Sequence, residues 1–255
     1  MDWRRAKSVL ILAFLILNVV LGYQLWLEWR ERIDRSVDLG SLSPEAQQAM
    51  NEKKIRITGK IPTETPRLRE MTYKLQEPPS MDASARTPID PPKETRIVFS
   101  TEELQQALGS VIPDLSKYRF DYYGSREGAY YSFNRMVDGL PFFDVRLELY
   151  YSELKIRSYR QDLMEELPSE SGPEQKVLPA TQAVASLILK KYLPAGANVQ
   201  EVTLGYHGQP IFDSETQVSS PSWRILIEGG DIYYVNAING EVSTDKGSAQ
   251  PAQTG

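Results

Sequence analysis

The segment AYYSFNRMVDGLPFFDVRLELYY, residues 129–151, decides the fold of this chain. It is rich in Tyr, Phe, Val and Leu, and Asp138-Gly139, a dipeptide typical of tight hairpin turns, divides it into two runs. Two further runs of similar composition, residues 118–124 and 153–163, lie on either side of it. Four such runs with turn residues between them predict an antiparallel meander.

The same order, a helix followed by a meander, occurs twice along the chain. The stretch Ser100-Thr101-Glu102-Glu103 predicts a helix start, and apolar residues at helical spacing continue that helix over 101–111. A second helix is predicted over 180–192, and strand-like runs follow it between residues 198 and 243. We therefore expect an α+β fold with two helix-plus-antiparallel-meander lobes, 97–167 and 175–246, as an internal duplication would produce.

Residues 30–96 are expected to hold a juxtamembrane helix, a strand pair and a proline-rich segment. Ser43-Pro44-Glu45 predicts the start of a short helix that ends near Lys54, and strands are predicted over 55–61 and 68–75. The segment 77–94 contains five prolines and few bulky apolar residues, which predicts a linker or a long surface excursion. The tail 247–255 is expected to be disordered.

The stretch Val9–Leu27 has no charged residue over 19 positions and would span roughly 28 Å as a helix, close to the thickness of a bilayer core. No small-x-small cleavage site follows it, so we expect residues 8–29 to be a retained transmembrane signal anchor. Three Lys or Arg residues precede this span and three follow it, so basic residues alone do not orient it. The short tail 1–7 favours a cytoplasmic N-terminus and an extracytoplasmic C-terminal domain at the cell membrane.

One stripe of the expected anchor carries its candidate interaction residues. Asn18 is an amide in mid-membrane, and Gly22 would permit close approach of a second helix. The alternative is a polar residue that the membrane tolerates without a partner. The predicted transmembrane interaction residues follow a 4-3-4-3-4 spacing: Ile11, Leu15, Asn18, Gly22, Leu25 and Trp29.

Composition excludes several classes of function. The residues after Arg35 include 23 basic and 30 acidic side chains, a net charge of −7, which argues against a nucleic-acid partner. The chain has no cysteine, so disulfides, thiolate metal sites and cysteine nucleophiles are absent. No catalytic, cofactor or metal motif is found, so we predict a non-enzymatic protein without a cofactor.

The chain has one histidine, His207, which we expect in a loop beside Tyr206. A catalytic histidine needs an orienting carboxylate and a nucleophile, and only Asp213 and Ser214 are close to it in the sequence. Adjacent aromatic residues on strands, such as Phe142-Phe143, should place one ring in the core and one outside.

Seven segments carry a resemblance to a known family: MDWRRAK (1–7), FLILN (14–18), IRITGKIP (55–62), YYSFNRMVDGLPFFDVRLELYY (130–151), LGYHG (204–208), PSWRILIEGG (221–230) and YYVNAINGEV (233–242). Together they resemble the YycI family, whose members regulate the WalK/WalR (YycG/YycF) two-component system. The resemblance implies an extracytoplasmic domain on one N-terminal helix. It also implies that this domain acts with a sister YycH-type protein. Together they would bind a sensor histidine kinase that controls cell-wall metabolism and restrain or tune its activity. The lobes would then be similar to those of YycH and PepSY-type domains, and the family implies no small-molecule ligand. An extracytoplasmic PepSY-like inhibitor or a cell-wall polymer-binding module is the alternative.

Overall fold

The computed structural model describes residues 14, 15, 17, 18, 21, 42–76, 86–124, 130–168, 173–209, 211, 214–244 and 247–248. The five described residues between 14 and 21 are helical. Within these ranges no helix is both long and apolar enough to span a membrane. Most of the expected anchor 8–29 and all of the expected tail 1–7 lie outside the described residues.

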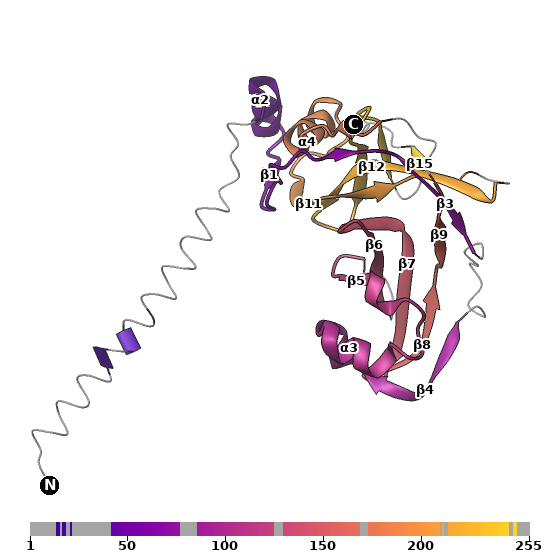
Figure 1. Cartoon of the computed structure of the whole chain (residues 1–255). Helices are drawn as coiled ribbons and strands as arrows, with labels where there is room; N and C mark the ends of the chain where they lie inside the picture. Colours follow the sequence, from indigo (N-terminus) through magenta and orange to yellow (C-terminus); the bar gives the residue numbers. More distant parts are fainter. Residues whose placement is uncertain are drawn as a thin grey trace, which may run out of the picture.

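From Leu42 onward the described chain forms an α+β fold with a large, mostly antiparallel sheet (Figure 1). Its helices are α2 (Pro44–Glu52), α3 (Thr101–Leu108) and α4 (Ala180–Leu189), with short 3₁₀ turns η3 (Thr95–Phe99) and η4 (Leu115–Lys117). The strands are β1 (Arg56–Ile57), β2 (Arg67–Leu68), β3 (Met71–Leu75), β4 (Thr87–Glu94), β5 (Tyr118–Asp121), β6 (Tyr130–Val137), β7 (Leu140–Ser152), β8 (Lys155–Gln161), β9 (Met164–Glu166), β10 (Gln175–Lys176), β11 (Asn198–His207), β12 (Thr216–Ile227), β13 (Ile232–Asn236), β14 (Val242–Thr244) and β15 (Gly247–Ser248).

The predicted helices begin at their predicted caps. The Ser43 side chain accepts a hydrogen bond from the backbone nitrogen of Ala46 at 3.3 Å, with Pro44 at the first helical position of α2. The Ser100 hydroxyl accepts from the backbone nitrogen of Glu103 at 3.2 Å and starts α3. These side chains satisfy backbone donors that have no partner within the first helical turn.

The first meander, β5 to β8, is confirmed. Its central hairpin pairs Val137 with Leu140 across the turn Asp138-Gly139, and both turn residues have positive φ, 50° and 81°. A two-residue turn with that backbone matches the twist of the flanking strands, which is why Asp-Gly predicts it. The second meander runs from β11 to β14.

The two meanders belong to one 13-stranded sheet. Strand β7 pairs with β6 and β8, and its first half also lies parallel to β11 through the pair Phe142–Tyr206. Strand β12 pairs with β11 and β13, and its first half pairs with β3, which pairs in turn with β9 at the end of the first meander. Long strands that change neighbours thus join the two halves.

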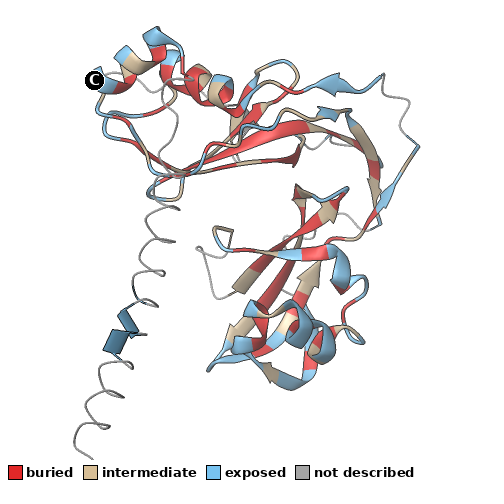
Figure 2. Ribbon diagram, turned by 60° about the vertical axis from the view of Figure 1, so that its left-hand side comes forward, coloured by how far each residue is buried: buried red, intermediate tan, exposed pale blue. Residues whose placement is uncertain are grey.

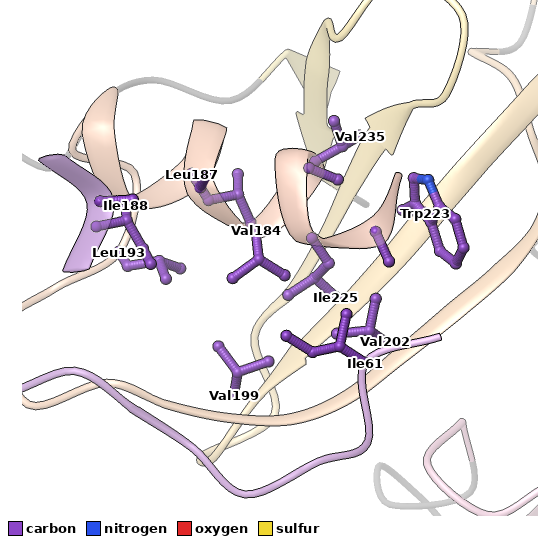
Figure 3. Close-up of a cluster of buried hydrophobic side chains, with 14 of the residues drawn as sticks. Ile61, Val184, Leu187, Ile188, Leu193, Val199, Val202, Trp223, Ile225 and Val235 are labelled. Carbon is purple, nitrogen blue, oxygen red and sulfur yellow. The ribbon is translucent and has the colours of Figure 1, made fainter. Parts of the chain in front are cut away.

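Three clusters of buried apolar residues form the core. The largest lies between the second meander, α4 and α2, and includes Val184, Trp223 and Ile225 (Figure 3). A second cluster packs α3 against the first meander, and a third, around Phe142 and Tyr206, lies where the two meanders meet. Figure 2 shows that buried positions concentrate on the strands and on the helix faces that cover them.

Three expectations about single segments are wrong. Residues 87–94 of the proline-rich segment form the outer strand β4, which pairs with β8 and buries Ile89, because prolines are tolerated where a strand has only one neighbour. The predicted strand 55–61 shortens to β1, since only Arg56 and Ile57 pair with β11. Gly247 and Ser248, predicted in the disordered tail, form β15 by pairing with β14.

Candidate functional site

The junction of the two meanders is the place where side chains far apart in the sequence meet. The parallel contact between β7 and β11 requires a glycine at position 205. A Cβ atom there would lie 2.3 Å from the carbonyl oxygen of Pro141 and 2.5 Å from the Phe143 ring. No other residue type allows the backbones to approach this closely, so the junction depends on Gly205.

His207 lies at this junction, at the end of β11 and not in a loop. Its Nδ1 atom is 2.6 Å from Oδ1 of Asp144 on β7, and its ring stacks on Tyr234 with a centroid distance of 3.7 Å. The Oδ2 atom of Asp144 accepts hydrogen bonds from the backbone nitrogen of Gly208 at 2.8 Å and from the Ser219 hydroxyl at 3.3 Å. The carboxylate therefore holds the ends of β11 and β12 against β7.

This cluster has three residue types of a catalytic triad but not its connectivity. In a triad the second imidazole nitrogen contacts the nucleophile. Here the Ser219 hydroxyl bonds to the carboxylate, and Ser219 is fully buried. The Nε2 atom of His207 is buried and has no hydrogen-bond partner among the described residues. The arrangement fits a structural joint and offers no activated nucleophile.

Tyr73 of β3 completes the joint. Burial, with a further contribution from the negative charge of Asp144, raises the pKa of the Tyr73 phenol to about 12. Its ring meets Phe142 edge to face at 4.9 Å. The phenol therefore stays neutral at physiological pH and contributes a packed aromatic ring with a polar end.

A second buried polar group, the Asp121–Arg224–Glu201 group, crosses the same junction. The Arg224 guanidinium of β12 donates to Asp121 of β5 at 2.5 and 3.3 Å and to Glu201 of β11 at 3.1 Å. Asn134 also donates to Asp121, at 2.9 Å. Burial acts to raise the pKa of Asp121, but attraction to Arg224 and the hydrogen bonds outweigh it, so the pKa is lowered. Asp121 is therefore ionised at neutral pH.

The aromatic pair Phe142-Phe143 shows that both faces of β7 are buried at the junction. Both rings are buried, against the expectation of one ring outside. Phe142 packs on Tyr206, whereas Phe143 faces Tyr234 at 5.6 Å and lies under the Arg224 guanidinium at 4.6 Å. Both faces of β7 are covered here because the second meander supplies the outer cover.

The predicted anchor residues are only partly described. Leu15 and Asn18 are helical, and the Asn18 side-chain amide donates to the Phe14 carbonyl oxygen of its own helix at 2.9 Å. Intrahelical bonding of this kind uses one donor that an interhelical contact would need. Ile11, Gly22, Leu25 and Trp29 lie outside the described residues, so the predicted stripe stays a prediction.

Asp144 and the Asp121–Arg224–Glu201 group were not predicted from the sequence, although His207, Tyr206 and Phe142-Phe143 were singled out. A usable signal was present, because Asp144 and Arg224 are charged residues inside otherwise apolar strand runs. Such residues need a buried partner. Within the described ranges no group of three or more His, Cys, Asp or Glu side chains could hold a metal ion.

Comparisons with known proteins identify the family of this chain. Curated protein sequences yield no match. Nine solved chains match, and one is the crystal structure of an uncharacterized protein from Eubacterium rectale ATCC 33656. It is 15% identical, with a TM-score of 0.29, and the match covers 49% of this chain and 42% of that one. We draw nothing about fold or function from a similarity of this size. The family model described as YycI protein matches residues 36–238, which is most of the chain. The chain therefore belongs to the YycI family.

Proposed function

We propose that this chain is a non-enzymatic, membrane-anchored regulator that acts with a YycH-type protein to bind and restrain a sensor histidine kinase of the WalK/YycG type. The observation that carries the proposal is the match to the YycI family over residues 36–238, since that family has a regulatory role in this two-component system. The domain is extracytoplasmic in this proposal, and its N-terminus is cytoplasmic.

The start of the folded domain packs in the core of its second half. Leu42, the first residue described after the expected anchor, is only 3% exposed and packs in the largest core cluster with Ala46 and Met50 of α2. That cluster includes α4 and the second meander.

The anchor stripe is the proposed contact with the transmembrane helices of the kinase. A tethered regulator can bias a kinase only through contacts that differ between the states of the kinase. Asn18 and Gly22 suit such contacts, one as a hydrogen-bonding group and one as a point of close approach.

Topology and association can be tested separately. A cysteine at Leu154, a residue that is 76% exposed, would be unique in this cysteine-free chain. We expect an impermeant thiol reagent to label it on intact cells, and labelling only after lysis would refute the proposed topology.

For association, the tagged full-length chain is purified from membranes that also contain the kinase and the YycH-type protein. We expect both proteins to co-purify and kinase output to rise when the chain is deleted. Sedimentation of the chain with isolated peptidoglycan, without either protein, would favour the polymer-binding alternative and refute the proposal.

A further inference from the structure

A pocket of about 310 Å³ lies beside the Asp121–Arg224–Glu201 group. It is lined by residues of β5, β6 and β7 from the first meander and of β11 and β12 from the second. Pockets between two halves of a fold are common ligand sites, and this volume lies at the small end of their range. It is large enough for one long side chain.

The charges at this pocket do not balance within the buried group. Asp121 is saturated, because it accepts hydrogen bonds from Arg224, from Asn134 and from the backbone nitrogen of Tyr123. The Oε1 atom of Glu201 accepts from Arg224 and from the Thr203 hydroxyl. No described residue donates to its Oε2 atom, and its side chain is 25% exposed. Two carboxylates thus share one guanidinium, and Glu201 keeps an unpaired oxygen.

Five of the eight other lining residues are apolar or aromatic. Phe120, Met136 and Pro141 contribute to its wall. Tyr122, which is 65% exposed, and Tyr123 also line it, and their rings meet edge to face at 5.3 Å. An apolar wall next to an unpaired carboxylate oxygen suits an amphipathic cation, whose hydrocarbon stem packs on the wall while its charged head reaches the carboxylate. Tyrosine faces add cation–π attraction.

Arg119 is a second cationic residue of the lining, besides Arg224. The guanidinium of Arg119 donates to the carbonyl oxygens of Ser116 and Tyr118 at 3.0 and 3.2 Å, which ties it to the start of β5. Arg119 is exposed, so water and salt screen its repulsion of a ligand cation more than they screen the attraction of the part-buried Glu201.

We propose that this pocket binds one arginine or lysine side chain presented by another protein. A protein source is favoured because β5 is an outer strand, with β6 as its paired neighbour in the described sheet (Figure 1). A partner main chain can lie along such a strand and direct alternate side chains toward the pocket. At the opposite edge of this meander, β8 is covered by the outer strand β4, which carries three prolines that cannot donate backbone hydrogen bonds. The proposal concerns the chemistry of a contact with a protein other than a second copy of this chain.

Saturation-transfer NMR on the full-length chain in a neutral detergent tests the proposal, with empty micelles as the blank. The probes are acetyl-Val-Arg-Val-methylamide, its norleucine analogue and agmatine. We expect the arginine tripeptide to bind with a dissociation constant on the order of 1 mM, as a small ligand with few contacts should. The norleucine analogue should bind at least about fivefold more weakly, because it lacks the cation.

Two variants and a control locate the site. Glu201→Gln retains an acceptor for Arg224 but removes the surplus charge, and Met136→Trp fills the pocket without changing charge. Both should weaken binding of the arginine tripeptide at least about fivefold. Glu241→Gln, at an exposed position of the second meander, should leave it unchanged.

Five results would overturn the proposal, four in the binding assay and one in the oligomeric state. The four are no binding of the arginine tripeptide, equal binding of the norleucine analogue, equal effects of Glu201→Gln and Glu241→Gln, and agmatine binding as tightly as the tripeptide. The last would assign the site to a small free cation. A dimer of the chain that dissociates on Glu201→Gln would identify a second copy as the source and would also overturn it.

Discussion

Replacing Arg224 by methionine should destabilise the protein far more than the loss of an ordinary surface ion pair. Arg224 is 6% exposed, and its guanidinium joins Asp121 and Glu201 across the junction of the two meanders. Methionine fills much of the same volume but leaves Asp121, itself 7% exposed, as a buried charge without its cation. Removing one partner of a buried pair costs about 3–5 kcal/mol.

The assay is thermal unfolding of the full-length chain, followed by far-UV circular dichroism and by fluorescence. For a domain of this size, 1 kcal/mol corresponds to a shift of about 2–4 °C, so a loss of 3 kcal/mol should lower Tm by about 6–12 °C. Arg157→Met is the matched control, because Arg157 pairs with Glu153 at 2.6 Å where both side chains are exposed, 45% and 82%. That substitution should cost less than about 1 kcal/mol.

A double substitution separates the buried charge from simple loss of packing. Asp121→Asn combined with Arg224→Met removes both charges, and we expect this protein to be more stable than the single Arg224→Met variant. Equal costs for Arg224→Met and Arg157→Met, or no recovery in the double variant, would refute the reasoning.

Three further predictions concern other parts of the chain. His207→Ala should lower the free energy of unfolding by about 2–4 kcal/mol in urea denaturation, because it removes the hydrogen bond to Asp144 and leaves a cavity. A loss under about 0.5 kcal/mol is typical of an exposed loop residue and would contradict this prediction. Burial raises the pKa of Asp162 because it favours the neutral carboxyl group. The contribution of this group to stability is therefore fully present below its unfolded-state pKa and is lost as pH rises through its folded-state pKa. Asp162→Asn should therefore stabilise the protein at pH 7 and lose this advantage near pH 4, and a pH-independent difference would contradict it. In membranes, Gly22→Leu should weaken co-purification of the kinase more than Leu21→Ala does, and Asn18→Leu should weaken it only a few-fold, because interhelical hydrogen bonds there average roughly 0.6 kcal/mol. If Gly22→Leu leaves association and kinase output unchanged, the anchor acts only as a tether and the prediction is wrong.

Local patterns predicted the elements that neighbouring residues define by themselves. Ser43 and Ser100 start helices because their side chains bond to backbone donors three residues away, and Asp138-Gly139 turns the chain because its backbone matches the hairpin. The family resemblance also came from linear segments. The anchor stripe rests on the same kind of local spacing and awaits the membrane experiments.

Composition alone misplaced segments whose conformation depends on a distant neighbour. The proline count of residues 77–94 predicts a linker, yet β4 forms there because it pairs with β8 as an outer strand of the sheet. The pair Phe142-Phe143 alternates faces as expected, but the second meander covers the face that would otherwise be solvated. Whether a strand face is buried depends on what packs on it, and that partner lies elsewhere in the chain.

The junction itself was decided only by the tertiary structure. Asp144 and His207 are 63 residues apart, and Asp121 and Arg224 are 103 residues apart. A buried charge is tolerated only when folding places its partner within hydrogen-bonding distance, and no local pattern encodes that distance. The sequence shows that Asp144 and Arg224 are charged residues in apolar strands, but the packing of β7 against β11 and β12 selects their partners.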